Sequence, residues 1–281
     1  NSSHQLCFIN HCWIAKNFLW GILLRLKTFL EGVPFKWRNL IEVEIFQGDN
    51  RDTLVDLKVK TNTRDLDSLR LDLLARSSFW KDQKVSINLS RSQRHSLTVL
   101  GTGFVTKIVG DWKFRVSRGS FFQVNDYMLD TLSENVVNGA KGKQALDLFC
   151  GVGFFSLPLA RMFGEVLAVD QNSSAIEDLK SNIKENKITN CHLFKMAVDT
   201  FLRIHRSRLK QIDLIVLDPP RSGLEKSTIK RLCELKVPQI TYVSCDPSTL
   251  ARDLGGLHQG GYSIDQLQIL DLFPQSHHLE T

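Results

Sequence analysis

The sequence predicts an α/β protein in which a smaller α+β region precedes a doubly wound parallel sheet. From residue 144 onward, short apolar strands alternate with helical stretches, which is the pattern of a parallel sheet covered by helices on both faces. Before residue 118, alternating strand patterns stand beside amphipathic helices instead. We therefore expect an α+β domain at residues 1–118 and the parallel-sheet domain at residues 119–281.

Composition places the chain among ordinary globular proteins. Of its 281 residues, 42% are hydrophobic and 23% are charged, which excludes a disordered chain, a collagen-like chain and a coiled coil. Lys and Arg number 36 against 30 Asp and Glu, a net charge of +6. This mild excess is compatible with an acidic partner such as nucleic acid but does not establish one.

The cysteines and the longest early apolar run exclude two further classes. Six cysteines show neither a CxxC pair nor zinc-finger spacing, so we expect no metal site, reduced thiols and a cytoplasmic setting. Residues 18–24 form a seven-residue apolar run between Asn17 and Arg25. A membrane span needs about 20 such residues, so we interpret this run as part of a buried helix.

In the first domain, residues 5–31 show the apolar spacing of one amphipathic helix that ends at Gly32 and Pro34. Residues 39–60 alternate apolar and polar side chains around a turn at 47–50, which indicates an antiparallel hairpin. Residues 66–74 are predicted to be helical, and strand-like patterning returns over residues 86–105.

In the second domain, a helix at 126–138 precedes five predicted strands. The strands are expected at residues 145–149, 166–170, 191–196, 212–217 and 239–244. Helices are expected between them or after them at residues 154–163, 174–186, 225–235 and 248–257.

A glycine turn follows the first of these strands. Gly151 and Gly153 let the backbone turn tightly and let a ligand approach it closely. A dinucleotide fingerprint requires a third glycine where Ser156 stands, and no phosphate-binding Gly-Lys-Ser/Thr motif is present. Asp170 ends the second strand, where a carboxylate can accept both hydroxyls of a ribose. These residues, with Asp147, fit an adenosine cofactor such as S-adenosylmethionine; the alternative is a tight turn of any α/β protein beside a surface aspartate.

Two further strand ends carry polar groups. Asp218 is followed by two prolines, which stiffen the turn, and then by Arg221, a residue that can contact a phosphate or a base edge. Cys245 ends the fifth strand and precedes Asp-Pro and a helix start. Each has a plain structural alternative, a simple loop for the first and a buried thiol for the second. Their shared position at the carboxyl edge of the sheet favours a nucleophile at Cys245.

These motifs resemble those of the RNA uracil-C5 methyltransferases. The resemblance rests on Asp147-Leu-Phe-Cys-Gly-Val-Gly, Leu217-Asp-Pro-Pro-Arg-Ser-Gly and Tyr242-Val-Ser-Cys-Asp-Pro-Ser-Thr-Leu-Ala-Arg-Asp-Leu. Two more stretches agree, Ser120-Phe-Phe-Gln-Val-Asn and Asp271-Leu-Phe-Pro-Gln-Ser-His-His-Leu-Glu. The resemblance implies a Rossmann-like class I methyltransferase domain that makes 5-methyluridine in RNA with S-adenosylmethionine as the methyl donor.

It also implies residue roles. Cys245 is expected to add to C6 of the uracil so that C5 becomes nucleophilic, and Glu280 is expected to remove the C5 proton afterwards. Arg221 would orient the substrate. The expected cofactor-binding residues are Gln123, Phe149, Gly151, Gly153, Asp170, Asp199 and Asp218. Asp199 would be the adenine-side acid, although the loop that carries it varies in spacing.

The implied partner is RNA, with ribosomal RNA favoured over tRNA, and the implied protein is a cytoplasmic monomer. The chain begins at Asn1 and shows no N-terminal barrel domain of the kind many relatives use to grip RNA, so we expect both domains to be parts of a longer protein. Cys7 and Cys12 are expected to be core residues of the first helix. They cannot hold the four-cysteine iron–sulfur cluster of some relatives by themselves, so no cluster is expected here.

Three features leave alternatives open. Phe154 stands where the family often has a polar residue, so a polar contact to the cofactor is missing. The basic run around Arg203, Arg206 and Arg208 is either an RNA contact or a solvated face. The function itself has two alternatives, another nucleobase methyltransferase that forms no thiol adduct, or a non-catalytic RNA-binding relative.

Overall fold

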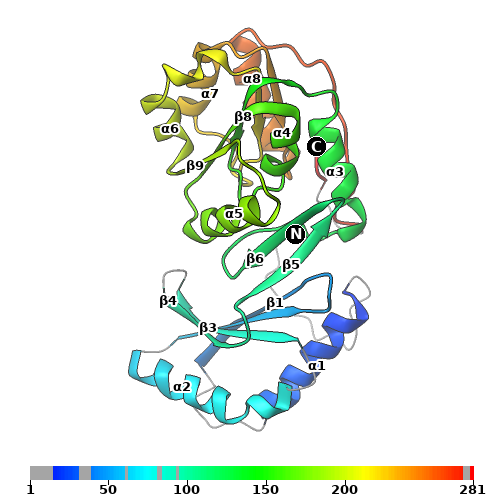
Figure 1. Ribbon diagram of the computed structural model, residues 1–281, viewed down its shortest axis with the longest axis vertical. Helices are drawn as coiled ribbons and strands as arrows, with labels where there is room; N and C mark the ends of the chain where they lie inside the picture. Colours follow the sequence, from blue (N-terminus) through cyan, green and yellow to red (C-terminus); the bar gives the residue numbers. More distant parts are fainter. Residues whose placement is uncertain (1–14, 32–38, 61–62, 81–83, 93–94, 275–278) are drawn as a thin grey trace. The chain divides into compact units, whose positions relative to one another are not determined.

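The computed structural model divides into two compact units, Asn1–Thr106 and Lys107–Thr281 (Figure 1). The division precedes residue 118 because strand β6 (Trp112–Ser117) packs against helix α5 (Ser173–Glu185) of the second unit. The structure describes residues 15–31, 39–60, 63–80, 84–92, 95–274 and 279–281.

The first unit contains a four-stranded sheet in the order β1-β2-β3-β4. The predicted hairpin is confirmed, since β1 (Leu40–Gln47) pairs antiparallel with β2 (Thr53–Val59). β3 (Val85–Ser92) lies parallel to β2, and β4 (His95–Leu100) lies antiparallel to β3. A parallel neighbour needs a crossover connection, and the chain between β2 and β3 supplies it.

Two helices form the core of this unit with the sheet. α1 (Asn17–Glu31) and α2 (Thr63–Ala75), which is followed by a 3₁₀ turn at Ser77–Trp80, pack apolar side chains against strands β2 and β3. The first helix was predicted to begin at residue 5, but residues 15 and 16 are not helical and the helix begins at Asn17. Apolar spacing does not mark where a helix starts, so the predicted start was wrong. Cys7 and Cys12 lie outside the described residues.

The second unit contains the predicted parallel sheet of five strands. Their order is β11-β10-β7-β8-β9, and every pair is parallel. The strands are β7 (Gly142–Leu148), β8 (Phe163–Asp170), β9 (Cys191–Lys195), β10 (Leu214–Leu217) and β11 (Gln239–Tyr242). The chain leaves β7 toward β8 and returns to β10 on its other side, which creates a switch point between β7 and β10 where ligands bind in such sheets.

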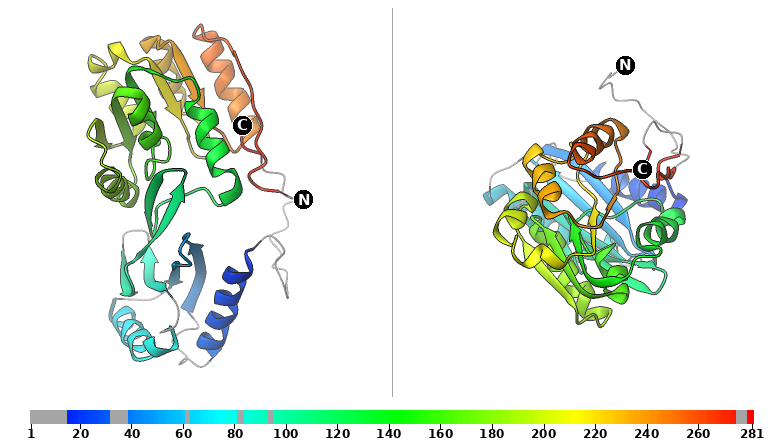
Figure 2. Two further views of the ribbon diagram at one scale, coloured as in Figure 1. Left: turned by 45° about the vertical axis from the view of Figure 1, so that its right-hand side comes forward. Right: turned by 90° about the horizontal axis from the view of Figure 1, so that it is seen from above.

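Helices cover both faces of this sheet (Figures 1 and 2). α4 (Ser156–Met162) and α5 contact one face, and the other face packs on α6 (Val198–Ile204), α7 (Lys226–Leu235) and α8 (Pro247–Gln259). The predicted helices are present within a few residues of their expected bounds. α6 and the 3₁₀ turn Arg208–Gln211 were not predicted, because the sequence there reads as a basic surface run.

A hairpin and a helix precede the sheet. β5 (Phe104–Val109) and β6 pair with each other, with Gly110 at φ 54° in the turn between them. A 3₁₀ turn, Asp126–Met128, then leads into α3 (Leu129–Val137), the helix that was predicted at 126–138. Among the described residues, no helix has both the length and the apolar character needed to cross a membrane.

Candidate active site

The register of the parallel sheet brings four strand ends to one edge. Leu217 of β10 lies between Leu148 of β7 and Tyr242 of β11, and Leu148 also pairs with Val169 of β8. The segments that follow these strands therefore start side by side. They carry the residues that the sequence singled out, so the expected convergence at the carboxyl edge is present.

The glycine turn after β7 has the backbone that its residues permit. Gly151 has φ 52° and Gly153 has φ 94°. A Cβ at Gly151 would meet open space, whereas a Cβ at Gly153 would clash with Leu179 of α5. Gly153 is thus required by packing, and Gly151 leaves room above the turn for a ligand. Phe149 also has a positive φ, 65°, a conformation that non-glycine residues seldom adopt.

Asp170 holds this turn in place. Its Oδ2 accepts a hydrogen bond from the Gly151 amide at 2.9 Å, and its Oδ1 accepts one from the Asn172 amide at 2.7 Å. Each carboxylate oxygen has a second lone pair, so Asp170 retains capacity for the ribose hydroxyls that the sequence analysis assigned to it.

Asp147 lies directly beneath the turn, within β7. It is fully buried, and Ser156 Oγ donates a hydrogen bond to its Oδ2. Its Oδ1 has no hydrogen-bond partner among the described residues. Burial raises the pKa of Asp147 to about 7, because removing a carboxylate from water disfavours its charged form.

Cys245 lies in a cluster with Arg221, Glu280 and Asp218. The Arg221 side chain hydrogen-bonds to the half-buried Cys245 thiol. Burial and the nearby Glu280 carboxylate raise the pKa of Cys245, while Arg221 opposes that shift. Burial likewise raises the pKa of Asp218 well above its usual range, and Glu280 adds to the effect. The structure therefore brings the predicted nucleophile, base and orienting residues together.

Backbone pairing brings Glu280 to this cluster. Glu280 and Leu270 exchange both backbone hydrogen bonds, at 2.8 and 3.1 Å, and Thr281 and Ser244 exchange both of theirs at 2.9 Å. Ser244 precedes Cys245, so the segment that carries Glu280 is paired to the segment that carries Cys245. Glu280 is only 2% exposed, and burial raises its pKa to about 7.

Gln123 lies in a segment that is fixed on two sides. It is buried, and two residues later the Asn125 side chain donates to the Leu272 carbonyl at 3.1 Å. Its neighbour Phe122 packs on Phe114 and Phe154, with ring centroids 5.4 and 5.6 Å apart. Phe154 thus contributes to an aromatic cluster, which is a structural reason for an apolar residue at the position where the family often has a polar one.

Asp199 is not connected to the other candidates by any described contact. It lies in the first turn of α6, and Arg231 of α7 donates to its carboxylate at 2.9 Å. This hydrogen bond holds the pKa of Asp199 below its usual value. The carboxylate is therefore engaged with α7, while the proposed adenine contact of Asp199 stays a prediction.

Ion pairs engage two residues of the basic run. Arg206 pairs with Glu234 at 3.4 Å and Arg208 pairs with Glu165 at 2.5 Å. Among the described residues, no group of three or more His, Cys, Asp or Glu side chains is arranged to hold a metal ion.

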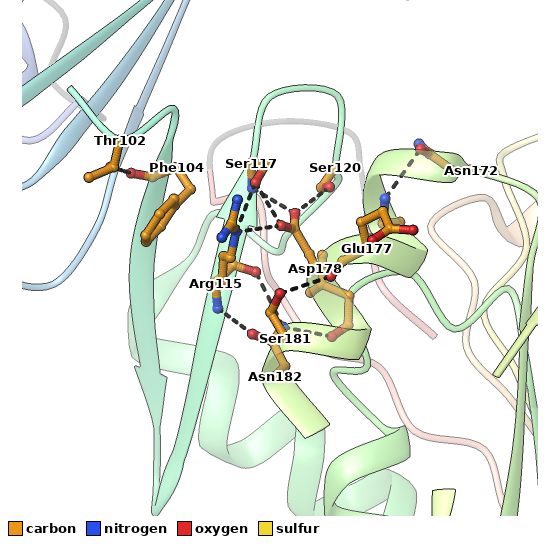
Figure 3. A network of polar contacts seen from close by, with 12 residues as sticks. Thr102, Phe104, Arg115, Ser117, Ser120, Asn172, Glu177, Asp178, Ser181 and Asn182 are labelled. Atoms are coloured by element: carbon orange, nitrogen blue, oxygen red, sulfur yellow. Dashed lines mark hydrogen bonds and ion pairs between the residues drawn. The ribbon is translucent and has the colours of Figure 1, made fainter. Parts of the chain in front are cut away.

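Sequence reasoning missed a set of polar residues on α5. Asp178 and Asn182 are almost fully buried, and both bond to β6, while Asp178 also bonds to Ser120 in the segment that leads to Gln123 (Figure 3). The signal was present as polar residues four apart on an otherwise amphipathic helix. This spacing of polar residues could not be distinguished from that of a solvated helix face, because the strand that the residues contact lies about 60 residues earlier in the chain and the sequence does not show that the two meet.

The family model described as tRNA (uracil-5-)-methyltransferase matches residues 2–281. The chain belongs to this family. The predicted resemblance to RNA uracil-C5 methyltransferases is thereby confirmed.

Several curated relatives are similar to this chain. An uncharacterized RNA methyltransferase of Aquifex aeolicus (strain VF5) is 41% identical over 174 residues, 62% of this chain and 40% of the relative. A tRNA (uracil(54)-C(5))-methyltransferase of Pyrococcus horikoshii is 35% identical over 206 residues, 73% of this chain and 48% of the relative. The chain thus spans about half the length of the curated relatives it matches, or less.

Solved structures confirm the predicted methyltransferase fold. The tRNA (uracil-54, C5)-methyltransferase of Pyrococcus abyssi, solved with S-adenosyl-L-homocysteine, is similar with a TM-score of 0.76 at 26% identity, covering 98% of this chain and 69% of that one. A tRNA m1G37 methyltransferase of M. jannaschii has a TM-score of 0.54 at 15% identity, covering 94% and 76%. At that identity it shows the fold alone.

Proposed function

We propose that this protein transfers a methyl group from S-adenosylmethionine to C5 of a uridine in RNA, through a covalent bond between Cys245 and C6 of the uracil. The observation that carries the proposal is the cluster of Cys245, Glu280, Asp218 and Arg221 at the carboxyl edge of the sheet. A thiol beside a cation, with a buried carboxylic acid next to it, suits nucleophilic addition followed by proton removal.

The glycine turn fits the adenosine part of the proposed cofactor. Gly151 leaves open space, Asp170 retains lone pairs, and the buried Asp147 lies under the turn. S-adenosylmethionine supplies an activated methyl group when bound. We propose that Gln123, Phe149, Gly151, Gly153, Asp170, Asp199 and Asp218 hold it, and the bound S-adenosyl-L-homocysteine of the P. abyssi relative supports a cofactor of this kind.

Cys245 starts the reaction in this proposal. Its thiol loses a proton to solvent, and the thiolate forms the S–C6 bond while the electrons of the C5–C6 double bond move toward C5 and the C4 carbonyl. Arg221 stabilises the thiolate, because its guanidinium hydrogen-bonds to the sulfur. The activated C5 then forms a bond to the methyl group as the bond between that methyl group and the donor sulfonium breaks, which leaves S-adenosyl-L-homocysteine.

Glu280 completes the reaction. After methyl transfer, C5 carries both a hydrogen and a methyl group. The Glu280 carboxylate removes that hydrogen as a proton, the electrons restore the C5–C6 double bond, and the C6–S bond breaks to return the thiolate. A base whose pKa lies at about 7 is suited to this exchange at neutral pH.

Two classes of RNA are candidates for the substrate, ribosomal RNA and tRNA. We favour ribosomal RNA from the sequence resemblance, while the Pyrococcus relatives, named for uracil 54 of tRNA, support tRNA as the second candidate. The proposal places the protein in the cytoplasm as a monomer, with residues 1–118 on the RNA side. A uridine inside a folded RNA must leave its stack to reach Cys245.

The test uses RNA that contains 5-fluorouridine. Fluorine cannot leave as a proton, so the protein, S-adenosylmethionine and substrate RNA should form a stable methylated adduct that survives denaturing electrophoresis. Both ribosomal RNA and tRNA transcripts are offered. Cys245→Ala should form no adduct, and Cys233→Ser, a change at a half-buried thiol on α7, should form it as the wild type does.

The same experiment separates the alternatives. Methyl transfer by Cys245→Ala would contradict the thiol mechanism and favour a base methyltransferase without an adduct. RNA binding by the wild type without methyl transfer to either RNA class would favour a non-catalytic RNA-binding protein.

A further inference from the structure

Two polar residues of α5, Asp178 and Asn182, and its C-cap residue Asn186 pair with the edge of β6 as a neighbouring strand would. These three residues are spaced four residues apart, and they accept hydrogen bonds from backbone amides spaced two residues apart on the strand. Figure 3 shows the pairs of Asp178 with Ser117 and of Asn182 with Arg115. Asp178 accepts from Ser117 at 2.7 Å, Asn182 from Arg115 at 2.7 Å and Asn186 from Lys113 at 3.0 Å.

The two spacings match geometrically. Four residues of α-helix rise by about 6.0 Å, and two residues of strand rise by about 6.6–6.8 Å. The amides of Asn182 and Asn186 also donate to the carbonyls of Arg115 and Lys113, at 3.2 and 2.7 Å. Helix α5 thus satisfies this edge of β6 in both directions and fixes the position of the strand along the helix.

Asn182 has one contact that Asn186 lacks. Its Nδ2 also donates to the Val152 carbonyl at 3.0 Å, and Val152 lies between the two glycines of the turn. The second bond of Asn186 goes to the Asn182 carbonyl within α5 instead. One buried amide, 1% exposed, therefore connects the glycine turn to β6.

Asp178 extends this connection toward Gln123. Its carboxylate accepts from the Ser117 hydroxyl at 2.6 Å and from the Ser120 hydroxyl at 2.7 Å, in addition to the Ser117 amide. Asn172, which caps the start of α5, donates to the Gly119 carbonyl at 2.7 Å. The segment between β6 and Gln123 is therefore bonded to α5 at several points.

We propose that Asn182 is a positioning residue for the methyl donor, because it bonds the glycine turn to the strand that leads to Gln123. The inference rests on the proposed function, in which the turn and Gln123 contact the same cofactor. Those two parts of the site come from segments about 30 residues apart, and Asn182 sets the distance between them. Loss of its donor atoms loosens one wall of the site relative to the other.

The test compares Asn182→Asp with Asn186→Asp. At position 182, the aspartate still accepts from the Arg115 amide but places a carboxylate oxygen against the carbonyls of Val152 and Arg115. At position 186, the same change affects the same strand without touching the turn. Affinity for S-adenosyl-L-homocysteine, the KM values for S-adenosylmethionine and RNA, and the melting temperature are measured for both variants and for the wild type.

Asn182→Asp should weaken S-adenosyl-L-homocysteine binding about tenfold or more, as expected for a lost buried hydrogen bond next to a ligand site. The KM for S-adenosylmethionine should rise in parallel, with the KM for RNA within about twofold of the wild type. For Asn186→Asp, the affinity for S-adenosyl-L-homocysteine and the KM values for S-adenosylmethionine and RNA should all stay within about twofold of the wild type. This should hold even where its melting temperature falls as far as that of Asn182→Asp.

Two results would overturn the inference: binding by Asn182→Asp that equals the wild type, or equal weakening by both variants. If Asn182→Asp does not fold, Asn182→Ser removes the Val152 bond without adding a charge, and the same criteria apply. Failure of the proposed function is distinguishable, because it appears as wild-type protein that binds no S-adenosyl-L-homocysteine or forms no 5-fluorouridine adduct.

Discussion

The environment of Cys245 holds opposing influences on one sulfur. Burial and Glu280 favour the neutral thiol, while Arg221 favours the thiolate. In the proposed mechanism, Cys245 therefore rests as a thiol and depends on Arg221 when it ionises. Because Glu280 is itself a weak acid here, with a pKa of about 7, the charge of the cluster changes near neutral pH.

This charge change predicts a pH dependence of adduct resolution. Glu280 must be ionised to take the C5 proton, so the rate of product release from the methylated adduct should rise with pH through about 7 and level off above it. Single-turnover measurements of adduct decay over a pH series test this. Glu280→Gln should accumulate adduct on ordinary uridine RNA at every pH, and a flat wild-type profile would contradict the role of Glu280.

Asp147 predicts a pH dependence of stability. Its ordinary pKa of 3.8 rises to about 7 in the folded protein, so between these values the folded state binds a proton that the unfolded state does not. The free energy of unfolding should fall as the pH rises across this window. Asp147→Asn keeps an acceptor for Ser156 and removes the cost of ionising a buried carboxyl group. The free energy of unfolding of the variant, relative to that of the wild type, should therefore increase by about 1–4 kcal/mol between about pH 4 and pH 8.

Thermal or urea unfolding of both proteins at the two pH values measures this gain. Comparison with the wild type cancels the contributions of the other acids. An equal effect of the substitution at both pH values would show that Asp147 is ionised in the folded protein.

At the scale of elements, the two glycines of the turn have different roles: Gly151 faces open space, and Gly153 packs against Leu179. Gly151→Ala enters open space, so it should cost only about 1 kcal/mol of stability for the left-handed backbone while its methyl group obstructs the ligand. Gly153→Ala clashes with Leu179 and should cost about 2–4 kcal/mol.

Thermal unfolding and S-adenosyl-L-homocysteine binding, measured on both variants, separate these effects. We expect Gly151→Ala to fold well and bind poorly. The reverse order of stabilities would contradict the packing described for the turn.

The elements show which features a sequence can predict. Helices with a wide apolar stripe and strands with buried runs, such as β7 and α5, were predicted within a few residues. The start of α1 was wrong, and the seven-residue α6 was missed, because neither a helix boundary nor a short helix in a basic run has a distinct periodic signal. The pairing of α5 with β6 depends on side-chain bonds between distant segments, and spacing along the chain does not encode it.

At the scale of the whole molecule, the second unit has its own core. Apolar side chains of its sheet pack on α6, α7 and α8 without residues from the first unit. A fragment of residues 102–281, which keeps β5 complete, should therefore unfold cooperatively and bind S-adenosyl-L-homocysteine within about threefold of the intact chain.

Circular dichroism melting and calorimetric binding of this fragment measure both properties. A fragment without a cooperative transition would show that the second unit depends on the first for its stability.

The sequence predicted the parallel sheet and the residues at its carboxyl edge, yet not the order of its strands. Strand order depends on which strands pair, and all five have similar buried apolar runs. Gly151, Asp170, Asp218 and Cys245 could be selected from the sequence because they lie at or just after strand ends, whereas Gln123 and Glu280 were selected only through the family resemblance. Asp178 and Asn182 could not be predicted as part of the surroundings of the site, because their hydrogen bonds join segments that are far apart in the sequence.

The paired backbones of Ser244 and Thr281 have a mechanical consequence. Two reciprocal hydrogen bonds hold the segment of Cys245 against the segment of Glu280, so the backbone constrains the separation of these two residues. In the proposed mechanism, main-chain pairing therefore keeps the residue that adds to the uracil adjacent to the residue that removes its proton.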